Sequence, residues 1–144
     1  MELDDDYWSA VRAMRLAVAD LLDELAPEEW ERPSLCAGWR VRDVAGHLSL
    51  IPTITTGEML RAGPRAGFNP NRINTLMARR YADRPTEAIV ARIRAHAGGR
   101  RTARVLDVRD SLFDVIVHSQ DIALPLGRTV DVPVEDTHLS LIHI

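Results

Sequence analysis

Hydrophobic and polar residues alternate with a helical period along almost the whole chain. In the first segment apolar residues recur at alternating spacings of four and three, as in one face of an amphipathic helix. These residues are Tyr7, Val11, Met14, Val18, Leu21 and Leu25. Asp4, Asp5 and Asp6 precede them, where negative charge suits the free N–H groups of a helix start. Pro27 follows the last of them, so we expect this helix to end near Ala26.

The same period predicts a second helix over residues 41–60, after a connector, EEWERPSLCAGW, that Pro33 and Gly38 interrupt. We expect Trp30 and Trp39 to pack this connector against the helices. A third helix should start at Asn69-Pro70, with asparagine as its cap and proline in its first turn. It should end near Asp83, after a loop over residues 61–70.

Two more helices complete the pattern. Pro85 opens the fourth helix, TEAIVARIRAHA, and Gly98-Gly99 closes it. A basic loop, RRTAR, then leads to a helix that holds LFDVIVHSQDI, with Asp107 as a candidate cap. Leu124-Pro125 and Gly127 end that helix, and TVDVPVED after it is extended.

The sequence therefore predicts an all-α protein. TVDVPV is the one strand-like run, and its proline argues against a strand. We expect an antiparallel four-helix bundle with a short extra helical segment, formed as one domain over residues 1–138. The last residues, LSLIHI (139–144), complete no element and are expected to be a non-native tail of a truncated chain, so His138 and His143 are given no role.

Composition excludes several classes of protein. Apolar residues make up 46% of the 144 residues, charged residues 27%, and the net charge is −3, as in an ordinary globular domain. No apolar run approaches the ~20 residues of a membrane span, so no membrane partner is expected. No face is strongly basic, which disfavours nucleic acid as a partner. A single cysteine, Cys36, excludes an internal disulfide and fits a cytoplasmic protein.

The last helix carries a polar stripe in apolar surroundings. Asp114, His118 and Asp121 fall on one side of the helix, together with Asp107 and Asp110. Apolar residues occupy most of the remaining circumference. Either the stripe is the solvent edge of a buried helix, or it faces inward and holds a ligand.

His47 bears on this choice because it lies at the centre of the apolar face of the second helix, among Val44, Leu48 and Ile51. A buried imidazole needs partners for its nitrogens. The partner is either a carboxylate such as Asp114 in the core, or a metal. Two imidazoles and one carboxylate suit Zn²⁺ or another divalent transition metal, and three protein ligands leave a position for water or substrate.

Other chemical groups give weaker signals. Asp43, one turn before His47, is either a partner of that ring or a charge in the first turn of its helix. Cys36 is a plain thiol or, with no base nearby in the sequence, a nucleophile. His96 suits a surface role near a helix C-terminus. The basic cluster is a solvated loop or an anion site, and its members are Arg94, Arg100, Arg101 and Arg104.

Three segments, RPSLCAGWRVRDVAGHL, PRAGFNPNRINTLMARRYADRP and LFDVIVHSQDIALPLG, resemble the N-terminal domain of the mycothiol-dependent maleylpyruvate isomerase family. This family belongs to the DinB-like group of metal-binding four-helix bundles, and the resemblance covers about residues 7–137. It implies a metal, usually zinc, held at His47, Asp114 and His118. It further implies an actinobacterial, cytoplasmic protein and mycothiol as a thiol cofactor whose thiolate the metal would stabilise.

The chain departs from the family pattern in three respects. The acid position is often Glu and here is Asp114, and Arg40 stands where a Thr cap is common. Full-length members also carry a C-terminal region that helps to form the active site, and we expect this chain to lack it. Metal binding is therefore expected to be separable from catalysis.

Two hypotheses follow. The first is the metal-binding domain of a mycothiol-dependent isomerase or S-transferase-like enzyme, with a small-molecule thiol and substrate as partners and a homodimer left open. Asp43 and Asp121 would then support the ligands, and Arg100, Arg101 and Arg104 would be available to an anion. The alternative is a non-catalytic helical binding or structural module with a His47–Asp114 core hydrogen bond and no metal.

Overall fold

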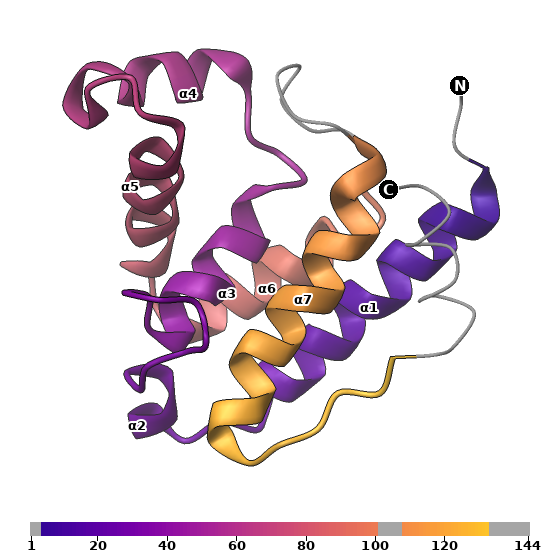
Figure 1. Cartoon of the computed structure of the whole chain (residues 1–144). Coiled ribbons are helices and arrows are strands. Elements are labelled where there is room, and N and C mark those ends of the chain that lie inside the picture. Colours follow the sequence, from indigo (N-terminus) through magenta and orange to yellow (C-terminus); the bar gives the residue numbers. More distant parts are fainter. Residues whose placement is uncertain (1–3, 101–107, 133–144) are drawn as a thin grey trace.

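The computed structural model describes residues 4–100 and 108–132, and within them the chain is helical with no β-strand. The prediction of an all-α protein is thus confirmed for this part of the chain (Figure 1). The α-helices are α1 (Asp5–Asp23), α2 (Pro27–Trp30), α3 (Val41–Leu50), α4 (Thr56–Ala62), α5 (Pro70–Ala82), α6 (Thr86–Ala95) and α7 (Ser111–Ala123). Three short 3₁₀ turns accompany them, η1 (Pro64–Ala66), η2 (Val108–Asp110) and η3 (Leu124–Leu126).

Helix starts follow the capping residues of the sequence. The Asp4 carboxylate accepts a hydrogen bond from the backbone N–H of Tyr7 and caps α1. Asn69 accepts from two backbone N–H groups at the start of α5, with Pro70 in the first position. Asp107, the candidate cap of the last helix, lies outside the described residues, as do Arg101, Arg104 and residues 133–144.

The prediction of one helix over residues 41–60 is wrong. The chain forms α3 and then, after a turn at residues 51–55, the separate helix α4. Pro52 explains the break, because proline has no backbone N–H with which to continue the helical hydrogen bonds. A capping box then starts α4, since Thr55 accepts from the backbone N–H of Glu58 and Glu58 accepts from that of Thr55.

The connector between α1 and α3 contains α2, one helical turn that begins at Pro27. Trp30 and Trp39 are both buried, which confirms that they pack the connector down. The Trp39 indole N–H also donates to the Thr75 hydroxyl on α5. The connector is therefore fixed on both sides of Gly38, whose positive φ of 80° turns the chain back toward α3.

The main core lies where α1, α3, α6 and α7 meet. Helix α1 packs against α6 and α7, and α3 packs against the same two helices. Figure 1 shows that α3 also lies between α7 and α5. A smaller core cluster fills the space between α3, α4 and α5, and it consists of Leu50, Ile54, Ala62, Met77 and Tyr81. Helix α3 thus has α7 on one side and α5 on the other, and side chains from either helix can form a site together with those of α3.

A glycine allows α3 and α5 to pack closely. A Cβ atom at Gly46 would lie 2.5 Å from the backbone oxygen of Ala78 and 2.7 Å from the backbone nitrogen of Ala82. These distances are too short for any side chain, so Gly46 is the point where the two helices make backbone contact. No helix in the described residues is long and apolar enough to cross a membrane.

Candidate metal centre

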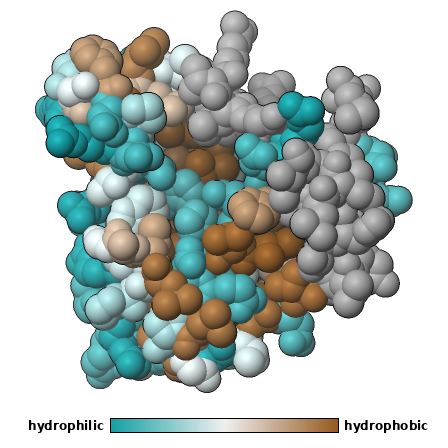
Figure 2. Space-filling model, in the orientation of Figure 1, coloured by the Kyte–Doolittle hydropathy of each residue, from teal (hydrophilic) through white to brown (hydrophobic). Residues whose placement is uncertain are grey.

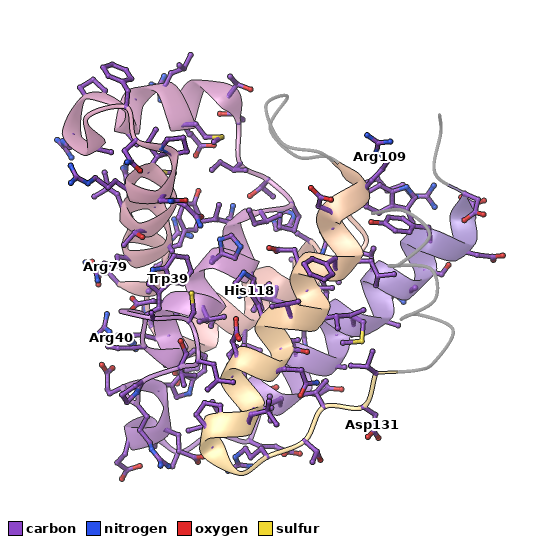
Figure 3. All side chains as sticks on the ribbon, in the orientation of Figure 1. Trp39, Arg40, Arg79, Arg109, His118 and Asp131 are labelled. Carbon is purple, nitrogen blue, oxygen red and sulfur yellow. The ribbon has the colours of Figure 1, made fainter. Side chains whose placement is uncertain are left out.

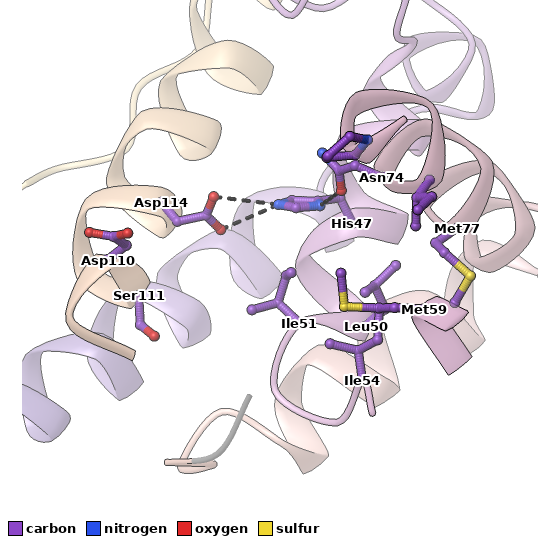
Figure 4. A pocket seen from close by; sticks show the side chains of 12 residues that line it. His47, Leu50, Ile51, Ile54, Met59, Asn74, Met77, Asp110, Ser111 and Asp114 are labelled. Atoms are coloured by element: carbon purple, nitrogen blue, oxygen red, sulfur yellow. Dashed lines mark hydrogen bonds and ion pairs between the residues drawn. The ribbon is translucent and has the colours of Figure 1, made fainter. Parts of the chain in front are cut away.

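His47 on α3 and Asp114 and His118 on α7 come together between the two helices. One ligand atom from each of the three side chains lies within 4.8 Å of the others. His47 Nε2 is 3.4 Å from each Asp114 carboxylate oxygen, and His118 Nε2 is 3.3 Å from Asp114 Oδ1. Figure 4 shows the Asp114 carboxylate directed at the His47 ring. Residues that are 67 positions apart in the sequence therefore converge on one point.

Each imidazole is held at its other nitrogen. His47 Nδ1 lies 3.1 Å from the amide oxygen of Asn74 on α5, and His118 Nδ1 lies 3.0 Å from the Asp121 carboxylate. An oxygen acceptor at Nδ1 fixes the hydrogen there and leaves the Nε2 lone pair directed at the cluster when the ring is neutral. Histidines that bind metals are oriented in this way. Two such nitrogens and a carboxylate fit Zn²⁺.

The polar stripe of α7 is not its solvent edge. Phe113 and Val117 are the α7 residues whose large apolar side chains are exposed, at 46% and 37%. Figure 2 shows apolar side chains gathered over this part of the surface. The side chain of His118 is only 17% exposed and that of Asp114 is 32% exposed. His47, which they face, is buried. The stripe therefore faces α3, with Asp114 at the accessible side of the cluster.

The cluster is electrostatically coupled. Burial opposes ionisation of Asp114, but the charge of His47 and hydrogen bonds from both histidines outweigh it and hold the pKa of the carboxyl well below its usual range. Burial likewise opposes the charged form of His118, yet Asp114 and then Asp121 raise its pKa above the ordinary value. The carboxylate is thus ionised at neutral pH and available as a ligand.

Trp39 forms one wall of the cluster. Its indole lies parallel to the His118 ring, with an interplanar angle of 11° and 6.4 Å between centroids, and 5.6 Å from the His47 ring (Figure 3). Sequence reasoning placed Trp39 in the core but not at the site, and it missed Asn74 altogether. Asn74 lies 27 positions from His47 in the sequence, and Trp39 lies in the connector, outside the helical spacing that identified the ligands. Only the packing of the connector and α5 onto α3 brings them there.

A cavity of about 300 Å³ adjoins the cluster and shares His47, Asn74 and Asp114 with it. It lies between α3, α4, α5 and the start of α7, as Figure 4 shows. Its apolar lining consists of Leu50, Ile51, Ile54, Met59, Pro70, Ile73 and Met77, and Asp110 and Ser111 complete the polar end. A small molecule in this cavity would touch two of the three candidate ligands, His47 and Asp114.

The sequence predicts that Asp43 and Asp121 support the His47 and His118 rings, but the structure gives the two carboxylates different partners. Asp121 contacts the His118 ring, as described above. The Asp43 carboxylate instead accepts three hydrogen bonds from Arg40, one of them from its backbone N–H, and so caps the start of α3. The structure therefore gives Asp43 the role of a charge in the first helical turn, and Asn74 takes the place beside His47.

The basic cluster is divided. Arg94 forms ion pairs with Asp20 and Asp23 on α1, and Arg100 forms one with Asp5. These pairs are exposed, as expected for a solvated surface, and the predicted anion site at Arg100, Arg101 and Arg104 stays a prediction.

Cys36 lies in the connector and is partly buried. Burial and, to a smaller extent, the charge of Asp121 raise the pKa of its thiol. A raised pKa is the opposite of what a nucleophilic cysteine needs. The structure therefore favours a packed thiol at this position.

The described residues thus form an all-helical domain in which two histidines and an aspartate could hold a metal ion beside an apolar cavity. The family model of the mycothiol maleylpyruvate isomerase N-terminal domain matches residues 11–107 of the chain, which therefore belongs to this family. The matched span contains His47 and Asn74, whereas Asp114 and His118 follow it. No curated protein and no solved structure matches the chain.

Proposed function

We propose that this chain is the zinc-binding domain of a mycothiol-dependent isomerase or S-transferase, with His47, Asp114 and His118 as the metal ligands. The observation that carries the proposal is that two histidine Nε2 atoms and one carboxylate converge. Each of the two histidine rings is also held by a hydrogen bond at Nδ1. The packing of α1, α3, α6 and α7 around one core supports a DinB-like four-helix bundle as the scaffold.

The chain's own residues supply orientation and a binding space. Asn74 and Asp121 keep both rings directed at one point, and Trp39 covers one side of the cluster. Three protein ligands leave a coordination position unused. A divalent metal there would lower the pKa of a bound thiol and so supply a thiolate at neutral pH. The adjoining cavity would hold the second reactant beside that thiol.

The alternative is a non-catalytic helical module without metal. The direct contact between His47 Nε2 and Asp114, at 3.4 Å, supports it, because this hydrogen bond already gives the buried ring a partner. This alternative predicts a protein whose stability does not change when a chelator or zinc is added.

Elemental analysis of the purified full chain after zinc reconstitution separates the two functions. We expect about one zinc per chain, and none in His47→Ala, because the substitution removes one of three ligands. His96→Ala is the matched control, since His96 ends α6 away from the cluster and should leave the zinc content unchanged. Protein that stays metal-free after reconstitution would contradict the proposal.

Thiol binding needs its own measurement. Cobalt(II)-loaded protein should develop a thiolate-to-cobalt absorption band when mycothiol is added, because the unused position accepts sulfur. His96→Ala should behave like the unsubstituted protein. Cobalt uptake with no change on addition of mycothiol would retain the metal site and exclude the thiol.

A further inference from the structure

The cavity beside the candidate metal centre has two chemically different ends. One end is formed by the apolar side chains of α3, α4 and α5, with Ile54 and Met77 buried at its base. The other end carries His47, Asn74, Asp110, Ser111 and Asp114. Figure 4 shows Met59 and Met77 across the cavity from Asp110 and Ser111. A ligand would therefore lie with one part among methyl and thioether groups and the other at the cluster.

The residues that line the cavity in the described chain carry two carboxyl groups and one imidazole, and the imidazole of His47 would be neutral as a metal ligand. Asp110 and Asp114 contribute carboxyl groups, and no arginine or lysine is among the lining residues of the described chain. An anionic ligand would lose its hydration against an apolar wall and would face two carboxylates. A divalent metal would offset the charge of a thiolate and of Asp114, which leaves no cation among the described lining residues for a second anion.

Two arginines of the described chain, the buried Arg15 and the partly buried Arg92, are engaged elsewhere. Arg15 donates to the backbone oxygens of Ala97 and Gly99. Arg92 donates to the backbone oxygen of Ser49 and to the hydroxyl of Thr53. Neither lines the cavity. These guanidinium groups are therefore not available to a carboxylate bound there.

We infer that the cavity binds an uncharged, largely apolar small molecule as the partner of the thiol, and that it excludes dicarboxylates. This inference rests on the proposed function and narrows it to a substrate class. Maleylpyruvate, which the family name contains, carries two carboxylates at neutral pH. The chain would thus share the scaffold of its family while acting on a neutral substrate.

A matched pair of unreactive probes tests this inference, dimethyl phthalate and the phthalate dianion, which share one ring and differ in charge. Binding is followed by NMR of ¹³C-labelled methionine methyl groups in the full chain. The chain has four methionines, of which Met59 and Met77 line the cavity and Met14 is buried in the main core. We expect the diester to shift the Met59 and Met77 signals with saturation, while Met14 stays unchanged and the dianion shifts neither.

Two neighbouring substitutions control the assignment. Met59→Glu places a carboxylate in the cavity and should weaken the diester affinity at least tenfold, read from the Met77 signal. Leu60→Glu adds the same charge next to it in sequence, where the side chain is 65% exposed and outside the cavity, and should leave the affinity unchanged. Met59 is only partly buried, so its substitution should not prevent folding.

Equal or tighter binding of phthalate, or no binding of the diester by folded protein, would overturn the inference. The same titrations with zinc-loaded protein separate it from the proposed function. Zinc uptake together with phthalate binding would contradict only the substrate class. Diester binding to protein that takes up no zinc would contradict only the metal-dependent function.

Discussion

At the scale of single residues, the site depends on two side chains that are not candidate ligands. Asn74 reaches His47 from α5, and Asp121 reaches His118 from one turn further along α7. Each accepts a hydrogen bond at Nδ1 and so directs Nε2 toward Asp114. The geometry of the cluster is therefore set by three helices, although its ligands lie on two.

Removal of either acceptor should weaken zinc binding without removing a ligand. We expect Asn74→Ala and Asp121→Ala each to lower the zinc affinity by about 10- to 100-fold, because the ring they hold would be free to turn. Competition with a chromogenic chelator measures this. Asn71→Ala on the same helix is the control, since the Asn71 side chain is exposed and outside the site. Unchanged affinity in both variants would exclude a positioning role.

Periodicity predicted the three candidate ligands because each lies on a regular helix whose faces can be read from spacing. His47 is buried and the stripe of α7 faces it, as the interpretation of an inward-facing stripe required. Spacing could not identify Asn74 or Trp39, whose positions depend on how α5 and the connector pack. It also could not decide the role of Asp43, which is turned toward Arg40 by its own helix start.

At the scale of elements, the contact of α3 with α5 determines whether Asn74 can reach His47. Gly46 makes that contact possible, because a Cβ atom there would overlap the α5 backbone. We expect Gly46→Ala to lower the free energy of unfolding by about 1–3 kcal/mol through overpacking. Urea unfolding followed by circular dichroism measures the change.

Gly57→Ala is the matched control for this substitution. Gly57 lies in α4, and a Cβ atom there would meet only the Thr55 hydroxyl oxygen at 3.8 Å. Alanine has the higher helix propensity, so the variant should be as stable as the unsubstituted chain or more stable by about 0.4–1 kcal/mol. Equal effects of the two substitutions would contradict the close packing at Gly46.

The division of residues 41–60 into two helices shows where a pattern of apolar residues fails. Ile51 and Ile54 continue the apolar period of α3 past its end, because they still pack in the second apolar cluster while the chain turns. Pro52 and the Thr55–Glu58 capping box were the stronger local signals. The turn matters for the site, since it brings Met59 of α4 over the cavity.

At the scale of the whole molecule, the segment after α7 is tied back to the connector by one arginine. Arg128 forms an ion pair with Glu29 of α2 at 2.9 Å and a longer one with Glu24. The hydrogen bond from Arg128 and then that from the Ala26 backbone N–H lower the pKa of Glu29 to about 2. The segment that follows α7 thus contacts the connector that follows α1.

This contact should contribute stability that depends on pH. Because the pKa of Glu29 is lower in the folded protein than its ordinary 4.5, the contribution is present above that pH and is lost as the pH falls toward about 2. Glu29→Gln should therefore lower the Tm at pH 6 and leave it nearly unchanged at pH 2. Glu28→Gln is the control, and a Tm difference that persists at pH 2 would exclude the ion pair as its cause.

The all-helical class and most helix boundaries followed from capping residues, prolines and glycines, which act locally. The order in which the helices pack did not follow, because several of them have apolar faces of similar width. Among the helices of the main core, α5 makes extensive contact only with α3, and it contributes Ala78 to that core. This position depends on Gly46 and on the second apolar cluster. No local signal in the sequence identifies that arrangement.

The stacking of Trp39 on His118 has an optical consequence. The chain holds three tryptophans, and because the Trp39 and His118 rings are stacked, we expect the emission of Trp39 to depend on the charge state of that imidazole. Protonation of the ring, or its coordination of a paramagnetic ion such as Co²⁺, would quench that emission. Trp39 is thus an intrinsic fluorophore at the site. Binding of such an ion can be followed in the unlabelled protein as a decrease in tryptophan fluorescence.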